Sequence, residues 1–64
     1  MVNIDKTIYA TFVLNEIAFK GYKNGNENVY EKGNTKIVVK GNDVFVNGTL
    51  TSLEDTMVLI KSMK

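Results

Sequence analysis

The 64-residue sequence contains no histidine, cysteine, arginine, tryptophan, proline or glutamine. Without histidine it has no imidazole base, no Ser-His or Cys-His nucleophilic pair and no imidazole ligand for zinc. Without cysteine it has no disulfide to support its fold. The carboxylates Asp43, Glu54 and Asp55 lack the regular ligand spacing of a calcium loop. We therefore expect a protein that is not an enzyme and that holds neither a metal nor a cofactor.

Long apolar runs are also missing. No segment approaches the roughly 20 apolar residues of a membrane-spanning helix, and residues 1–19 lack the basic start and uninterrupted apolar stretch of a signal peptide. Eight asparagines and eight lysines with no arginine indicate an AT-rich genome, such as that of a low-GC bacterium or its phage. We expect a single small domain over residues 1–64 in the cytoplasm of a bacterial host cell, with no membrane association.

One repeated dipeptide dominates what is present. Gly25-Asn26, Gly33-Asn34 and Gly41-Asn42 recur every eight residues. Each fits a two-residue type II′ hairpin loop, because glycine adopts the positive φ of the first position without steric cost and asparagine tolerates the second position. The six residues between successive loops make a typical strand. This spacing predicts an antiparallel β-meander.

Two-residue loops also predict which residues lie opposite one another. The expected pairs are Lys32 with Thr35, Tyr30 with Ile37, Lys40 with Asp43, Val38 with Phe45, Tyr22 with Val29, and Lys20 with Glu31. One face then gathers the apolar side chains of Phe19, Tyr30, Ile37, Val39, Val44 and Val46. The opposite face carries two polar rows, one of Lys20, Glu31, Lys36 and Asn47 and one of Asn24, Glu27, Lys40 and Asp43. A slip of one residue would destroy both patterns, so their agreement favours this register.

The segments on either side of the meander are less regular. Residues 7–14 alternate as a strand does and are rich in β-branched and aromatic types, so we favour a strand there. The alternative is a helix that is capped by Asp5 and ends at Gly21. After Gly48, a serine followed three residues later by an aspartate resembles a capping box and predicts a C-terminal helix. Its alternative is a hairpin that turns at residues 54–55.

The predicted fold is therefore mainly β, with an antiparallel meander of four to five strands and one C-terminal helix packed on one face. If residues 7–14 are helical, the predicted order of elements becomes αβββα. In the favoured version the core lies between the apolar face of the sheet and the C-terminal helix.

The face of the sheet that points away from this helix carries an apolar row of Tyr22, Val29, Val38 and Phe45, extended by Tyr9 if the first strand forms. Lysines border the row. An apolar stripe with a charged rim is typical of protein interfaces. The alternatives are ordinary cross-strand contacts or the buried second side of a closed barrel. The candidate partner-binding residues are Tyr9, Tyr22, Val29, Val38, Phe45, Lys20, Lys36 and Lys40.

These features lead to the hypothesis of a small protein-binding module, in a specific form an inhibitor of a host protein or defence complex encoded by a phage or mobile element. One alternative is a homo-oligomeric structural protein. Another is a small β-barrel-like protein that binds single-stranded nucleic acid through aromatic stacking and lysines. The net charge of only +1 argues against nucleic acid, because phosphate binding depends on a positive surface.

Residues 36–57 are similar to the first conserved motif of the Sm-like RNA-binding proteins. The matching positions are Gly48, Leu50, Glu54 and Met57. The resemblance implies RNA binding. The family typically has an RNA-contacting asparagine after the methionine, whereas this chain has Val58. The chain therefore lacks the residue with which this family contacts RNA, and we do not assign the chain to the family.

Overall fold

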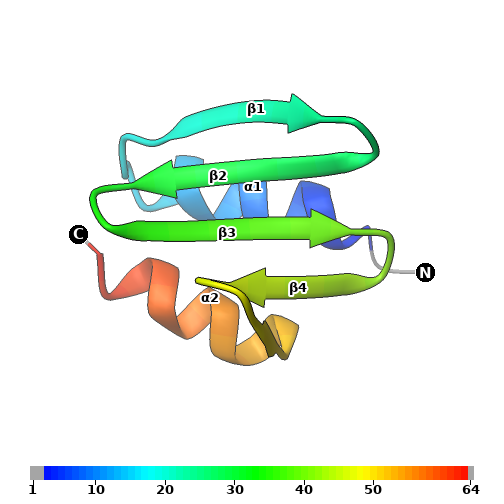
Figure 1. The fold of residues 1–64 in the computed structure, drawn as a ribbon. Coiled ribbons are helices and arrows are strands. Elements are labelled where there is room, and N and C mark those ends of the chain that lie inside the picture. Colours follow the sequence, from blue (N-terminus) through cyan, green and yellow to red (C-terminus); the bar gives the residue numbers. More distant parts are fainter. Residues whose placement is uncertain (1–2, 64) are drawn as a thin grey trace.

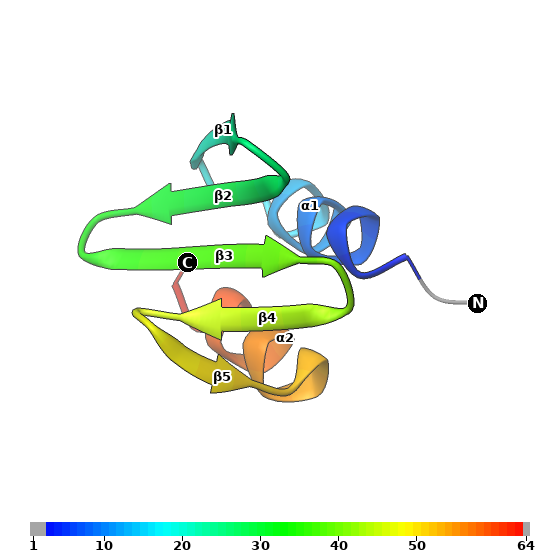
Figure 2. The same ribbon diagram turned by 45° about the vertical axis from the view of Figure 1, so that its right-hand side comes forward.

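The computed structural model describes residues 3–63 and contains a five-stranded antiparallel sheet, which one helix precedes and a second helix follows in the sequence (Figure 1). The elements are α1 (Ile4–Leu14), β1 (Lys20–Asn24), β2 (Glu27–Lys32), β3 (Thr35–Lys40), β4 (Asp43–Val46), β5 (Thr49–Thr51) and α2 (Leu53–Lys61). Strands that follow one another in sequence are neighbours in the sheet. Both helices lie on one face of the sheet, which we call the inner face (Figures 1 and 2). No helix or strand within residues 3–63 covers the opposite face, which we call the outer face.

The Gly-Asn loops close the hairpins as the sequence predicts. Gly25, Gly33 and Gly41 have φ angles of 63°, 57° and 60°, and the asparagines that follow them have no positive φ. This combination is that of a type II′ turn. All six predicted cross-strand pairs occur in the observed register. The meander over β1 to β4 is confirmed residue by residue.

Strand β5 was not predicted. It follows a fourth two-residue loop, in which Asn47 has a φ of 50° and Gly48 a φ of 86°. Two successive positive φ angles make a type I′ turn, for which Asn-Gly is the preferred sequence. The loop turns the chain back so that Leu50 lies opposite Phe45. The sheet therefore gains an edge strand after Gly48, where we expected the approach to the helix.

The prediction of a strand over residues 7–14 is wrong, because this segment belongs to helix α1. The helix is capped by Asn3 and not by Asp5; the Asn3 side chain accepts a hydrogen bond of 3.0 Å from the backbone N–H of Lys6. Ile8 and Phe12, four residues apart, are both fully buried. Packing of such a stripe supplies most of the stability of a short helix. The fold is thus mainly β with two helices, and it has more strands than the predicted αβββα alternative.

Helix α1 ends well before Gly21, in a Schellman motif around Glu16. Glu16 has a φ of 57°, and its N–H donates to the carbonyl of Val13 at 3.0 Å. The N–H of Ile17 donates to the carbonyl of Phe12, also at 3.0 Å. This hydrogen-bond pattern satisfies the last carbonyls of a helix and normally has glycine at the left-handed position. The motif directs the chain so that Ile17 returns to the core.

Helix α2 begins as the sequence predicts. The Ser52 side chain accepts a hydrogen bond of 3.1 Å from the N–H of Asp55, so the capping interaction is confirmed and the alternative hairpin at residues 54–55 is wrong. Ile60 is fully buried, and Leu53 packs against the core. The two helices pack against each other as well as against the sheet.

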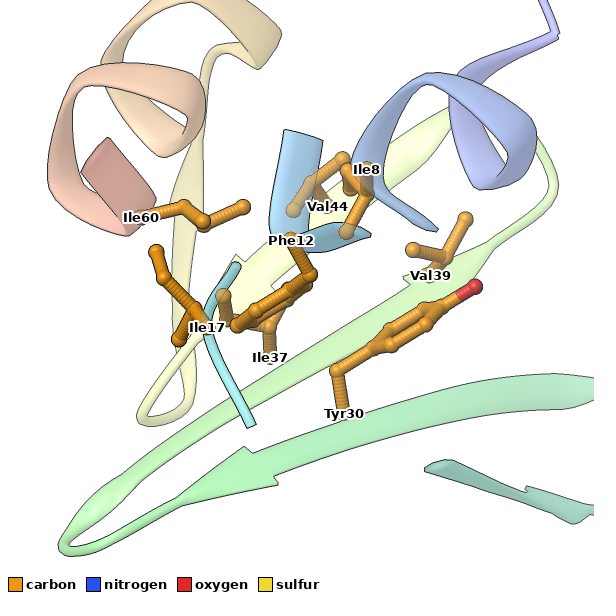
Figure 3. Close-up of a cluster of buried hydrophobic side chains, with 8 residues drawn as sticks. All are labelled: Ile8, Phe12, Ile17, Tyr30, Ile37, Val39, Val44 and Ile60. Atoms are coloured by element: carbon orange, nitrogen blue, oxygen red, sulfur yellow. The ribbon is translucent and has the colours of Figure 1, made fainter. Parts of the chain in front are cut away.

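The core lies between the helices and the inner face (Figure 3). Its buried members are Ile8, Phe12, Ile17, Tyr30, Ile37, Val39, Val44 and Ile60. Phe19 and Val46, the other residues predicted for this face, pack at its margin and are partly buried. The rings of Phe12, Phe19 and Tyr30 pack against one another, with centroid distances of 4.6 Å from Phe12 to Phe19, 5.8 Å from Phe12 to Tyr30 and 5.5 Å from Phe19 to Tyr30. The helix layer thus covers the inner face and leaves the outer face as the available sheet surface.

Candidate functional site

The outer face carries an unbroken apolar row with one residue on each of the five strands. We call it the outer row; its members are Tyr22, Val29, Val38, Phe45 and Leu50. Each member is the direct cross-strand partner of the next. Side chains paired in this way on one face of an antiparallel sheet are in contact. The row therefore forms a continuous apolar stripe across the whole width of the sheet.

Exposure varies along the outer row. Val29 is only 1% exposed although no helix covers it, because it lies between Tyr22 and Val38. Val38 and Phe45 are half-buried. The two ends of the row project further: Tyr22 is 38% exposed and Leu50 is 64% exposed. The row thus offers a packed centre and two exposed large side chains, one at each edge of the sheet.

Two polar rows flank the outer row, as predicted. The first contains Lys20, Glu31, Lys36 and Asn47, and the second contains Asn24, Glu27, Lys40 and Asp43. Within each row a lysine lies opposite a carboxylate on the neighbouring strand. Such cross-strand neighbours contribute about 0.2 to 1 kcal/mol each. Positive and negative charges alternate along each row, so neither border of the outer face is uniformly positive or negative.

Tyr22 is held in place by two contacts from the first polar row. Its hydroxyl donates a hydrogen bond of 2.6 Å to Oε2 of Glu31. The Nζ of Lys20 lies 5.6 Å from the centroid of its ring, within the range of a cation–π contact. The hydrogen bond to Glu31 raises the pKa of Tyr22 above its ordinary value. These two contacts therefore fix the orientation of the Tyr22 ring.

The outer face is hollowed over β3 and β4. A shallow depression of about 580 Å³ is lined by Glu27, Lys36, Val38, Lys40, Phe45, Asn47 and Gly48. Val38 and Phe45 form its apolar part, and the lysines and Glu27 form its rim. The bare backbone at Gly48 leaves one side of it open. The shape and chemistry suit an apolar side chain of another molecule, with polar contacts around it.

The structure brings together seven of the eight predicted site residues on the outer face: Lys20, Tyr22, Val29, Lys36, Val38, Lys40 and Phe45. The placement of Tyr9 in the same row is wrong, since Tyr9 lies on α1 and packs edge-on against Phe19 at 5.7 Å. Sequence reasoning missed Leu50. The signal for it is the Asn47-Gly48 dipeptide, because Asn-Gly prefers a type I′ turn and such a turn places Leu50 opposite Phe45.

Within residues 3–63 no group of three or more carboxylates is arranged to hold a metal ion. Neither helix of the described chain has the length and apolarity needed to cross a bilayer. Comparison with protein-family models, with curated proteins and with solved structures gives no match.

Proposed function

We propose that this chain is a small non-enzymatic protein-binding module that acts through its outer face. The observation that carries the proposal is the outer row, which crosses all five strands on the uncovered face and ends in exposed Tyr22 and Leu50. Soluble monomeric domains seldom leave a contiguous apolar stripe of this kind open to water. Protein interfaces combine such a stripe with aromatic anchors and a polar rim.

The charges on the outer face favour a protein partner over a nucleic acid. Lys36 and Lys40 each have a glutamate as the direct neighbour on β2, and Lys40 also has Asp43 on β4. Binding to a phosphate backbone depends on neutralising several phosphates with unopposed cations. Mixed charges around an apolar centre instead suit the irregular charge pattern of a protein surface.

In its specific form, the proposal is that the outer face covers a site on a larger host protein. A phage- or mobile-element-encoded inhibitor of a host enzyme or defence complex, acting in the cytoplasm of a bacterial cell, fits the small size and the lysine- and asparagine-rich composition. Occlusion requires no catalytic group. It requires a rigid surface, and the outer row lies on regular strands that two-residue loops hold in register.

Self-assembly is the second candidate, and the charge pattern favours it specifically. On the outer face β2 carries Glu27 and Glu31, whereas β3 carries Lys36 and Lys40 at the same levels. A two-fold axis parallel to the strands, between β2 and β3, would place the glutamates of one copy over the lysines of the other. The same operation stacks Val29 on Val38 of the second copy.

Two measurements test the proposal in order. Light scattering gives the mass in solution, and a dimer that Val38→Asp converts to a monomer would favour self-assembly. If the protein is a monomer, tagged wild type and a Tyr22→Ala, Phe45→Ala double variant are used for pull-down from a host lysate. We expect one or more proteins to be retained by the wild type and lost from the double variant. Identical captured proteins for both would contradict the proposal.

A further inference from the structure

We propose that the free edge of β1 binds an extended acidic peptide segment as a sixth strand, with one apolar side chain of the peptide placed beside Gly21 and against Phe19. Strand β1 is the first strand of the sheet, and among residues 3–63 it pairs with β2 alone. All five of its residues are exposed. An exposed edge is a template for strand addition, in which main-chain hydrogen bonds give affinity and pockets give specificity.

The register shows which backbone groups of β1 are available. Because Gly25-Asn26 is a two-residue loop, Asn24 and Glu27 form the hydrogen-bonded pair next to it. Hydrogen-bonded pairs alternate along an antiparallel ladder, so Tyr22 and Lys20 also direct their N–H and C=O groups toward β2. Gly21 and Lys23 therefore direct theirs away from the sheet. These four groups define where an incoming strand would pair.

A hollow lies beside this edge. It has a volume of about 320 Å³ and is lined by Tyr9, Phe19, Gly21, Tyr22, Asn28, Val29 and Tyr30. Its size is at the lower end of the range of ligand pockets. The Phe19 ring packs over Gly21 and forms one wall of the hollow, since a Cβ at that position would lie only 3.2 Å from Cε2 of Phe19. Residues paired directly across a ladder point to the same face, so the peptide residue opposite Gly21 would point toward this aromatic surface.

Charge identifies the chemistry of the peptide. Strand β1 carries Lys20 and Lys23 and no acidic residue. Lys20 has Glu31 as its cross-strand neighbour, whereas the neighbour of Lys23 is the neutral Asn28. Two copies of β1 at this edge would bring four lysines together with no acidic residue on either strand, so the charges disfavour a second copy there. An acidic strand would instead place carboxylates beside both lysines.

The pattern required of the peptide follows from the register. Read antiparallel to β1, it has an acidic residue opposite Lys23, a β-branched residue opposite Tyr22, an apolar residue opposite Gly21 and an acidic residue opposite Lys20. The probe is therefore a capped, fluorescently labelled hexapeptide of sequence Glu-Asp-Val-Leu-Glu-Asp. Binding is followed by fluorescence anisotropy. A second peptide with lysine at the four acidic positions is the charge control.

We expect saturable binding of the acidic probe at or below millimolar concentration and weaker binding of the lysine peptide.

A probe with an N-methylated leucine loses the main-chain donor opposite Gly21, and we expect its affinity to fall by about fivefold or more. Lys23→Val removes the charge and keeps the outward N–H, whereas Lys23→Pro removes both. We therefore expect Lys23→Pro to bind the probe more weakly than Lys23→Val.

Absence of binding at millimolar concentration, equal binding of the lysine peptide, or equal binding of the N-methylated probe would each overturn the proposal. The N-methylated probe is tested on the wild-type protein, so the result does not depend on whether a variant folds. The proposal is also separable from that for the outer face. Leu50→Asp alters the far edge of the sheet, and we expect it to leave binding of the probe unchanged.

Discussion

The hydroxyl of Tyr30 on β2 donates a hydrogen bond to the carboxylate of Asp5 in the first turn of α1, joining two residues that are 25 positions apart. The same hydroxyl lies 3.3 Å from the backbone carbonyl oxygen of Asp5. The Tyr30 ring stacks against Phe12 of the same helix. This residue therefore joins the sheet to α1 through both its ring and its hydroxyl.

Removal of that hydroxyl tests how far α1 depends on the Tyr30–Asp5 contact. Tyr30→Phe keeps the ring in the core and deletes the hydrogen bond to a charged acceptor. We expect a loss of about 1.5 to 3 kcal/mol in the free energy of unfolding, measured by urea titration. Tyr9→Phe is the matched control, because the Tyr9 side chain is 54% exposed. Equal stability of the two variants would contradict the role assigned to Tyr30.

The same residue predicts a dependence of stability on pH. Burial, and then the hydrogen bond to Asp5, raise the pKa of Tyr30 above its ordinary value of 10.0. The folded state therefore retains the phenol proton more strongly than the unfolded state does. This contribution is complete below about pH 10 and is lost as the pH rises from there toward the folded-state pKa.

Urea unfolding at a series of pH values up to about pH 11 measures this effect. We expect the free energy of unfolding to fall more steeply above pH 10 for the wild type than for Tyr30→Phe. The lysines and the other tyrosines are present in both proteins, so the difference isolates Tyr30. Parallel curves for the two proteins would show that burial of this phenol does not affect its ionisation.

Glu16 predicts a stabilising substitution. It occupies the left-handed position of the Schellman motif with a φ of 57°, a conformation that costs an ordinary residue roughly 1 to 2 kcal/mol. Glycine adopts it without strain but loses more backbone entropy on folding. We expect Glu16→Gly to increase the free energy of unfolding by about 0.5 to 1 kcal/mol, measured by urea titration.

Ala18→Gly is the control for Glu16→Gly. Ala18 is exposed and follows the same turn, but it has no positive φ. The substitution increases the conformational entropy of the unfolded chain without relieving strain in the folded state. We therefore expect the free energy of unfolding to fall by about 0.4 to 1 kcal/mol. A gain from Ala18→Gly as large as that from Glu16→Gly would attribute the effect to general flexibility of the segment.

The sheet could be predicted from the sequence because its turns are local. A Gly-Asn pair requires only its own backbone preferences to close a hairpin, and the eight-residue spacing then determines the register of β1 to β4. Strand β5 follows from the same rule with the order reversed, Asn47-Gly48 in a type I′ turn. The sequence therefore contains the signal needed to predict both β5 and the position of Leu50.

Helix α1, unlike the sheet, could not be predicted from local sequence signals. Ile8 and Phe12 fit both the alternation of a strand and the spacing of a helix, so periodicity alone does not decide between the two. Burial of these two side chains against the inner face decides it, and that surface exists only after the sheet has formed. The helix also ends at Glu16 without the glycine that usually marks such an end. Tyr9 was misplaced for this reason.

The most direct test of the account compares Leu50→Asp with Val58→Asp. The two side chains are almost equally exposed, at 64% and 67%, but Leu50 ends the outer row and Val58 lies on α2. Binding of each variant to a protein captured by the wild type, or to a second copy if the wild type is a dimer, is measured by titration. The account predicts that Leu50→Asp weakens binding at least about tenfold and that Val58→Asp binds as the wild type does. Unchanged binding of Leu50→Asp, or an equal loss for both variants, would contradict the assignment of the outer row as the contact surface.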